Sequence, residues 1–219
     1  MPSDANPLIQ INYRPIPGWS LLVFLAACPL VGLVVVWFLP DREMLSILGA
    51  FFVIGLGAVA VAVAPLGKAA LPALGFRSAN WKYAVFGALG TLALSVAVSQ
   101  IGIEPKGMKQ VMDVVRGPRQ LVLSLLLLAV LAPLVEELVF RGLLYGWVAG
   151  RWGSLPALVV SSLAFAAAHF EPAHIVLVLP LGLLFGWLRR RTDSLLPSLC
   201  AHIFNNGFAL LAAVYLPDA

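Results

Sequence analysis

Several ionisable or strongly polar side chains lie inside otherwise apolar stretches in the second half of the sequence. They are Glu136, Glu137, Arg141, His169, His202 and Asn206. Inside a membrane span, an ionisable side chain near the bilayer centre costs about 2.5 to 3.5 kcal/mol on insertion scales. Because such a cost calls for a partner or a function, these residues form the candidate functional site.

Two adjacent acids and an arginine make up the first group. Glu137 and Arg141 are four residues apart, so they share one helical face in the favourable acid-before-base order. Glu136 lies about 100° round the helix from that face and lacks the same partner. We therefore predict that Glu137 is a structural carboxylate paired with Arg141 and that Glu136 is available for chemistry. The alternative is that both acids only flank the arginine at the end of a span.

Two histidines follow, each with a polar or aromatic partner four residues away. Only alanines separate Phe165 from His169, so a neighbouring helix could approach this face closely. His202 and Asn206 both donate hydrogen bonds without a fixed charge, as an oxyanion-stabilising pair must. Taken singly, the His169 pattern also fits a hydrogen-bonded core residue, and the His202 pattern fits polar contacts between membrane helices. That last use is our prediction for Asn205.

The combination of an acid, two histidines and an asparagine on three separate apolar runs suits a hydrolase that activates water. No activated serine, catalytic-looking cysteine or pair of aspartates accompanies them. Glu136 would act as general base on a water that His169 helps to hold or polarise. His202 and Asn206 would face the oxygen of the tetrahedral intermediate. We expect no metal and no other cofactor.

Other polar residues nearby are left out of this set. We predict that Glu171 and His174 are solvated in a turn between two spans. Asp193 and Ser194 stand directly before the last apolar run, where they fit a helix cap.

The composition identifies the surroundings of these residues. Of the 219 residues, 61% are hydrophobic and 11% are charged, whereas a soluble domain is roughly half apolar and about a quarter charged. So few charges cannot cover a water-facing surface, and we predict a multi-pass integral membrane protein with the lipid bilayer as its partner. The net charge of +4 resides in short clusters between apolar runs. Such clusters, Arg189 to Arg191 among them, are expected at the membrane surface rather than on nucleic acid.

The apolar runs have the length that a membrane-spanning helix needs, about 20 residues. We predict about seven spans, within a range of about six to eight. Their approximate ranges are 18–39, 44–66, 83–103, 120–145, 154–169, 175–188 and 195–216. Long, continuous apolar character favours helices over the alternating strands of a membrane barrel. The predicted fold is therefore all-α, a polytopic transmembrane helical bundle.

The polar residues divide this bundle into parts. We predict an N-terminal tail at 1–17, scaffold helices at 18–119 and catalytic helices at 120–216, because the first three spans hold almost nothing ionisable. With seven spans, most basic residues share one side, which favours a cytoplasmic N-terminus. They are Arg14, Lys68, Arg77, Lys82, Arg151, Arg189, Arg190 and Arg191.

Over residues 120–216 the sequence resembles the CPBP family, the glutamic intramembrane endopeptidases of the CAAX prenyl protease and bacteriocin-processing type. Three short motifs in order carry the resemblance: Glu-Glu-x-x-x-Arg, Phe-x-x-x-His and His-x-x-x-Asn. They start at Glu136, Phe165 and His202. The sequence departs from the family at Asp193, where a glycine is commoner, and we expect this to alter a turn and not the chemistry.

The resemblance implies a helical membrane bundle that cleaves a peptide bond with a glutamate-activated water. It implies that Glu136 and His169 activate this water, that His202 and Asn206 form the oxyanion site, and that Glu137 and Arg141 support them. Phe165 is a further supporting residue. The expected partner is a peptide or membrane-protein substrate, and the short loops suggest a bacterial cytoplasmic membrane.

Two other classes of function fit the same residues. A zinc peptidase could use Glu136, His169 and His202 as ligands, although the sequence lacks the usual His-Glu-x-x-His helix. A non-catalytic membrane protein could use the buried acids as relay or binding groups. Examples of that class are a bacteriocin immunity protein, a membrane chaperone or a proton-coupled carrier.

Overall fold

The computed structural model describes residues 16–38, 43–100 and 117–216, together with positions 102, 113 and 115. Every regular element in these ranges is helical. The all-α prediction is therefore confirmed. Residues 1–15 of the predicted tail, and the predicted span ends at Leu39 and Ile103, lie outside the described residues.

The first half of the chain forms mostly long apolar helices. They are α1 (Gly18–Phe38), α2 (Met44–Val63), a 3-10 segment η1 (Ala64–Ala69), α3 (Ala70–Leu74) and α4 (Lys82–Ser99). Helix α3 ends at Gly75, whose φ of 95° is the left-handed conformation that favours glycine after a helix.

The second half begins with one continuous helix, Pro118–Trp152. Its parts are α6 (Pro118–Ser124), the π-helical η2 (Leu125–Leu131), α7 (Ala132–Glu137), the π-helical η3 (Leu138–Leu144) and α8 (Tyr145–Trp152). The chain then forms α9 (Ser154–Ala167), α10 (Pro172–Thr192) and α11 (Leu196–Tyr215).

Among the described residues, five helices are long and apolar enough to cross a membrane. The first part of α1, Gly18–Leu30, and helix α9 form shorter apolar segments. All of them coincide with predicted spans. Three predictions were too short, because the helices predicted at 44–66, 120–145 and 175–188 are Met44–Leu74, Pro118–Trp152 and Pro172–Thr192. Apolar windows missed these ends because polar residues continue the helices.

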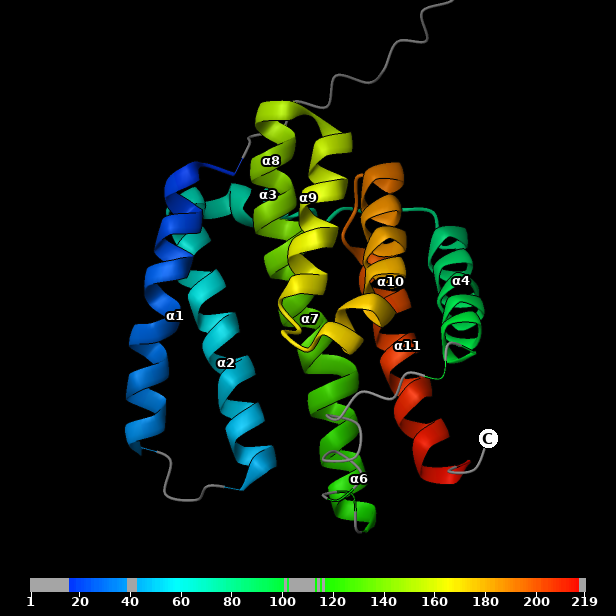
Figure 1. The fold of residues 1–219 in the computed structure, drawn as a ribbon. Helices are drawn as coiled ribbons and strands as arrows, with labels where there is room; N and C mark the ends of the chain where they lie inside the picture. Colours follow the sequence, from blue (N-terminus) through cyan, green and yellow to red (C-terminus); the bar gives the residue numbers. More distant parts are fainter. Residues whose placement is uncertain are drawn as a thin grey trace, which may run out of the picture.

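Figure 1 shows the Pro118–Trp152 helix in the middle of the bundle, with α1 and α2 on one side and α4 on the other. Helix α2 contacts η2 and α7, whereas α4 packs on α10 and α11. The turn between α9 and α10 lies part-way along the central helix rather than at its end (Figure 1). The end of the Phe-x-x-x-His motif, in this turn, therefore lies level with the middle of the bundle.

Glycines allow the closest helix contacts in this arrangement. A Cβ on Gly87 of α4 would lie 2.7 Å from a methyl of Leu188 and 2.8 Å from the Cβ of Ala201. A Cβ on Gly55 of α2 would lie 2.6 Å from a methyl of Val135. The outer helices therefore approach the motif-bearing helices through small residues, as membrane helices commonly do.

Candidate active site

The predicted pair between Glu137 and Arg141 is present at the centre of the bundle. Arg141 Nη1 lies 3.0 Å from Glu137 Oε1, and both side chains are fully buried. Arg141 Nη2 also donates to the carbonyl of Gly182 in α10, at 2.9 Å. The guanidinium thus joins the central helix to α10 as well as holding the carboxylate.

Aromatic rings enclose the same guanidinium. Its central carbon lies 4.4 Å from the ring centroid of Phe165 and 5.4 Å from that of Phe185. A cation over an aromatic face is attracted by the ring, and more strongly where water is excluded. Phe165 of α9 therefore contacts Arg141 directly, in agreement with its prediction as a supporting residue.

His202 lies between the two glutamates. Its Nδ1 is 3.2 Å from Glu137 Oε1 and its Nε2 is 3.4 Å from Glu136 Oε2. The imidazole stacks on the Phe185 ring, with centroids 4.5 Å apart and planes inclined by 21°. The Glu136 side chain is 27% exposed while those of Glu137 and His202 are 0% and 4% exposed. Glu136 is thus the accessible acid of the pair.

The charges of Glu136, Glu137, Arg141 and His202 can offset one another. A carboxylate accepts hydrogen bonds and cannot donate them, so His202 Nδ1 donates to Glu137 Oε1. With a second proton on the imidazole, Nε2 would also carry an N–H toward Glu136. Two carboxylates, one guanidinium and such an imidazolium would sum to zero, which would reduce the cost of placing these groups in a membrane.

His169 joins the group through Phe165. Its Nδ1 lies 2.9 Å from the Phe165 carbonyl oxygen, and since a carbonyl only accepts, Nδ1 carries the proton of this bond. In the neutral ring, Nε2 is then an acceptor. The Phe165 ring centroid lies 5.1 Å from that of His169 and 5.6 Å from that of His202. One phenyl group therefore separates the two histidines.

The prediction that His174 is a solvated turn residue was wrong. It lies in the first part of α10 and is half-buried, and its ring centroid is 4.5 Å from that of His169. The available signal was Pro172, because proline is favoured at the first position of a helix. His174 is thus an additional residue in ring contact with His169.

Asn206 donates a hydrogen bond to a backbone carbonyl that lacks its usual helical donor. In η2 the N–H of Ala132 bonds five residues back, to Leu127, and the next residue, Pro133, has no N–H to give. The Leu128 carbonyl therefore lacks a helical donor, and it accepts from Asn206 Nδ2 at 3.1 Å. This bond anchors α11 to the central helix, and Asn206 keeps a second N–H on the same nitrogen.

Sequence reasoning also placed Arg189 at the membrane surface, and this was wrong. Arg189 is fully buried. Its Nε donates to the Arg141 carbonyl at 3.1 Å and its Nη1 to Asp193 Oδ1 at 3.0 Å. In the π-helical η3 the N–H of Tyr145 bonds to Phe140 and Gly142, which leaves the Arg141 carbonyl open to this donor.

Asp193 forms ion pairs in addition to the turn after α10. Its φ of 55° is left-handed, which explains why glycine is the commoner choice after a helix. The aspartate adds two ion pairs, to Arg189 at 3.0 Å and to Arg77 at 2.7 Å. Of the two residues predicted to cap the last helix, Ser194 accepts the N–H of Leu196 with its hydroxyl at 3.2 Å, while the N-cap position of α11 is Leu195.

No three His, Cys, Asp or Glu side chains in the described part of the chain are grouped to hold a metal ion. The zinc alternative needs Glu136, His169 and His202 together. The structure brings Glu136 within 3.4 Å of His202, whereas His169 bonds through Nδ1 to the Phe165 carbonyl and is near enough to Glu136 to act on it electrostatically. Metal dependence and the catalytic roles of the individual residues stay predictions, as does the division into scaffold and catalytic helices.

Comparison with known proteins agrees with the resemblance. Residues 118–208 match the family model described as type II CAAX prenyl endopeptidase Rce1-like, a stretch that contains every candidate site residue. A Bacillus subtilis (strain 168) protein named "Putative membrane peptidase YdiL" is 26% identical over 112 residues. These residues are 51% of this chain and 44% of that protein, so the chain spans less than half of that relative's length. No solved structure matches.

These matches confirm the predicted likeness to the CAAX prenyl protease type. Together with helices long enough to cross a membrane, they support a membrane peptidase. The helices long and apolar enough to cross a membrane confirm the prediction of a multi-pass integral membrane protein, and the bacterial relative agrees with the predicted bacterial cytoplasmic membrane.

Proposed function

We propose that this protein is an intramembrane endopeptidase that hydrolyses a peptide bond of a membrane-associated substrate with a water activated by Glu136. One observation carries the proposal. A line of contacts runs from Arg141 through Glu137 and His202 to Glu136, and only the last of these side chains is accessible. The matches to a CAAX prenyl endopeptidase family and to a named membrane peptidase support the reaction class.

The buried pair fixes the imidazole. Arg141 holds Glu137 as a carboxylate, and Glu137 accepts the Nδ1–H of His202. This directs Nε2 of His202 toward the space beside Glu136. A preorganised donor on a nearly buried imidazole stabilises developing negative charge more than it would in water.

Glu136 is the general base. It takes a proton from water as the oxygen attacks the carbonyl carbon of the scissile bond. The resulting oxyanion accepts hydrogen bonds from His202 Nε2 and from the second N–H of Asn206. Collapse of the tetrahedral intermediate breaks the carbon–nitrogen bond, and the proton held by Glu136 passes to the leaving amine.

His169 holds the water against Glu136. Its Nδ1–H is engaged by the Phe165 carbonyl, so its Nε2 accepts one hydrogen of the water while Glu136 takes the other. The substrate is a peptide or a membrane-protein segment of CAAX-like or related type. No metal or other cofactor takes part in these steps.

Glu136→Gln tests the proposal. The amide keeps the volume but cannot accept the proton, so turnover of a reporter peptide falls by at least about 10² to 10⁴. Glu43→Gln makes the same change at an exposed acid before α2 and should leave turnover unaltered. Both purified variants should melt like the unaltered protein. Full activity of Glu136→Gln would remove Glu136 from the mechanism.

Inhibitors separate this chemistry from the alternatives. Because the nucleophile is a water held by a carboxylate and an imidazole, cleavage should persist in strong chelators and after treatment with serine or cysteine reagents. The same reporter peptide measures all three conditions. Activity that is lost in chelator and restored by zinc would support the zinc peptidase instead.

A further inference from the structure

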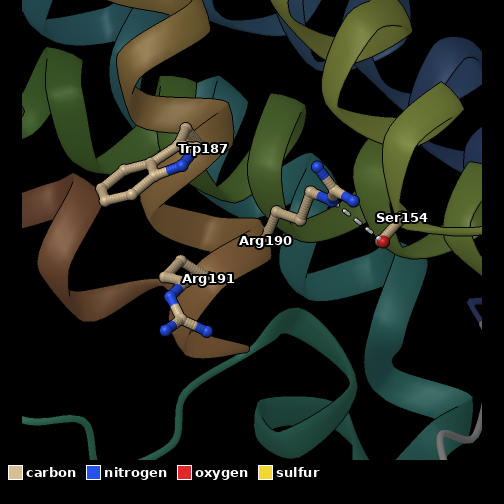
Figure 2. Close-up of a pocket in the computed structure, with 4 residues that line it drawn as sticks. All are labelled: Ser154, Trp187, Arg190 and Arg191. Carbon is tan, nitrogen blue, oxygen red and sulfur yellow. Dashed lines mark hydrogen bonds between the residues drawn. The ribbon is translucent and has the colours of Figure 1, made fainter. Parts of the chain in front are cut away.

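A second polar site lies at one end of the bundle, apart from the glutamates. A cavity of about 420 Å³ is lined by Ser154, Trp187, Arg190 and Arg191. Figure 2 shows Arg190 reaching from α10 toward Ser154 at the start of α9, with Trp187 and Arg191 of the same helix on the other side of Arg190 from Ser154. The cavity therefore lies where α10 ends and α9 begins.

The two arginines of this cavity have no acidic partner among the described residues. Arg190 Nε donates to the hydroxyl of Ser154 at 3.2 Å, a bond that orients the guanidinium without neutralising it. Asp193 is the acid closest to them in the sequence, and it pairs with Arg77 and Arg189 instead. Two exposed positive charges thus line one small cavity whose other lining residues, Ser154 and Trp187, carry no negative charge.

The surroundings are those of a membrane interface. Trp187 is half-buried, and its ring centroid lies 6.4 Å from that of Tyr83 and 5.4 Å from that of Phe86. Tryptophan and tyrosine are enriched at the level of lipid headgroups. The ends of α8 and α10 and the start of α9 lie at the same end of the bundle (Figure 1). The positive-inside rule assigns this end to the cytoplasmic side.

We propose that this cavity binds the phosphate headgroup of an anionic phospholipid. Arg190 and Arg191 contact the phosphate oxygens, and Ser154 both holds Arg190 and offers its hydroxyl. The aromatic cluster around Trp187 contacts the glycerol and upper acyl region. Basic pockets between membrane helices on the cytoplasmic side are suited to such headgroups, and each nearby arginine adds appreciably to the attraction.

A bound lipid would bridge α9 and α10. Phe165 lies in α9, His169 in the turn that joins the two helices, and His174 in α10. The inference does not depend on the proposed peptidase activity, because it rests on the cavity and its charges alone.

The test uses purified full-length protein in a neutral detergent. Short-chain phosphatidylglycerol is titrated while the melting temperature is recorded. The double variant Arg190→Gln/Arg191→Gln should bind this lipid about tenfold or more weakly, from the loss of two interfacial charges. The matched control Lys82→Gln/Arg151→Gln removes the same charge from the same end, outside the cavity, and should keep the affinity. Ser154→Ala should weaken binding by a smaller factor.

Three outcomes would overturn the proposal. Equal affinity in the Arg190/Arg191 double variant would show that the cavity does not bind the lipid. An equal response to short-chain phosphatidylcholine would remove the requirement for an anionic headgroup. An equal response to inorganic phosphate would assign the site to a free anion. Native mass spectrometry of the lipid-bound protein provides an independent readout of the same comparison.

Discussion

The central helix and α4 are both apolar enough to span a membrane, yet they are built for different environments. In its most apolar window, 39% of the Pro118–Trp152 helix is buried, against 11% of α4. The central helix carries Glu136, Glu137 and Arg141, whereas α4 has no ionisable residue after Tyr83. Ionisable residues therefore occur where neighbouring helices can supply partners, and the lipid-facing helix docks through small residues and hydroxyls.

The largest effect should come from breaking the buried pair of the central helix. Glu137→Ala leaves the Arg141 guanidinium buried and unpaired, which costs about 3 to 5 kcal/mol for a fully buried pair. We expect a lower melting temperature and lower expression, measured in the same detergent as Glu136→Gln. A stable but inactive Glu137→Ala, beside an unstable Glu136→Gln, would reverse the roles assigned to the two acids.

An intermediate effect should come from adding a methyl group where α4 packs against α10 and α11. Gly87→Ala places a methyl against Leu188 and the backbone-fixed Cβ of Ala201, and overpacking of this kind costs about 1 to 3 kcal/mol. Gly57→Ala is the control, because nothing lies within 4 Å of that position. Thermal unfolding of both variants measures the difference. Equal melting temperatures would mean that α4 docks less closely than described.

The smallest effect should come from the polar contact of α4. Ser95 donates to Asn205 Oδ1 at 2.8 Å, and such contacts between membrane helices average about 0.6 kcal/mol in double-mutant cycles. The cycle of Ser95→Ala, Asn205→Ala and the double variant isolates this coupling. A coupling as large as that of the Glu137 pair would show that α4 is held by polar bonds and not by shape.

Contacts within one helix were readable from the sequence. The spacing of Glu137 and Arg141 determined their pairing because four residues bring side chains together on a helix wherever the helix lies. Continuous apolar runs likewise gave the spans, since the bilayer sets their length. Asn205 as a contact between helices was also predicted, and its bond to Ser95 of α4 confirms it.

Contacts between helices were not readable in the same way. The position of His202 between both glutamates depends on the rotation of α11 against α7, which many non-local packing contacts set together. The π-helical turns shift backbone hydrogen bonds by one residue, and apolar periodicity does not report such a shift. Arg189 was missed for a related reason, because a cluster of arginines at a span end looks the same whether or not one of them turns inward.

The aspartate after α10 also has a consequence for the order in which the protein can be assembled. Arg77 and Asp193 are 116 residues apart, and Arg77 and Arg189 are both synthesised before the acid that they share. Chains fold from the N-terminal side as they emerge during synthesis. A chain interrupted before Asp193 therefore lacks the carboxylate that joins Arg77 to Arg189, so we expect unfinished copies to pack less tightly and to be degraded. We therefore expect the complete helical bundle to form only after nearly the whole chain has entered the membrane.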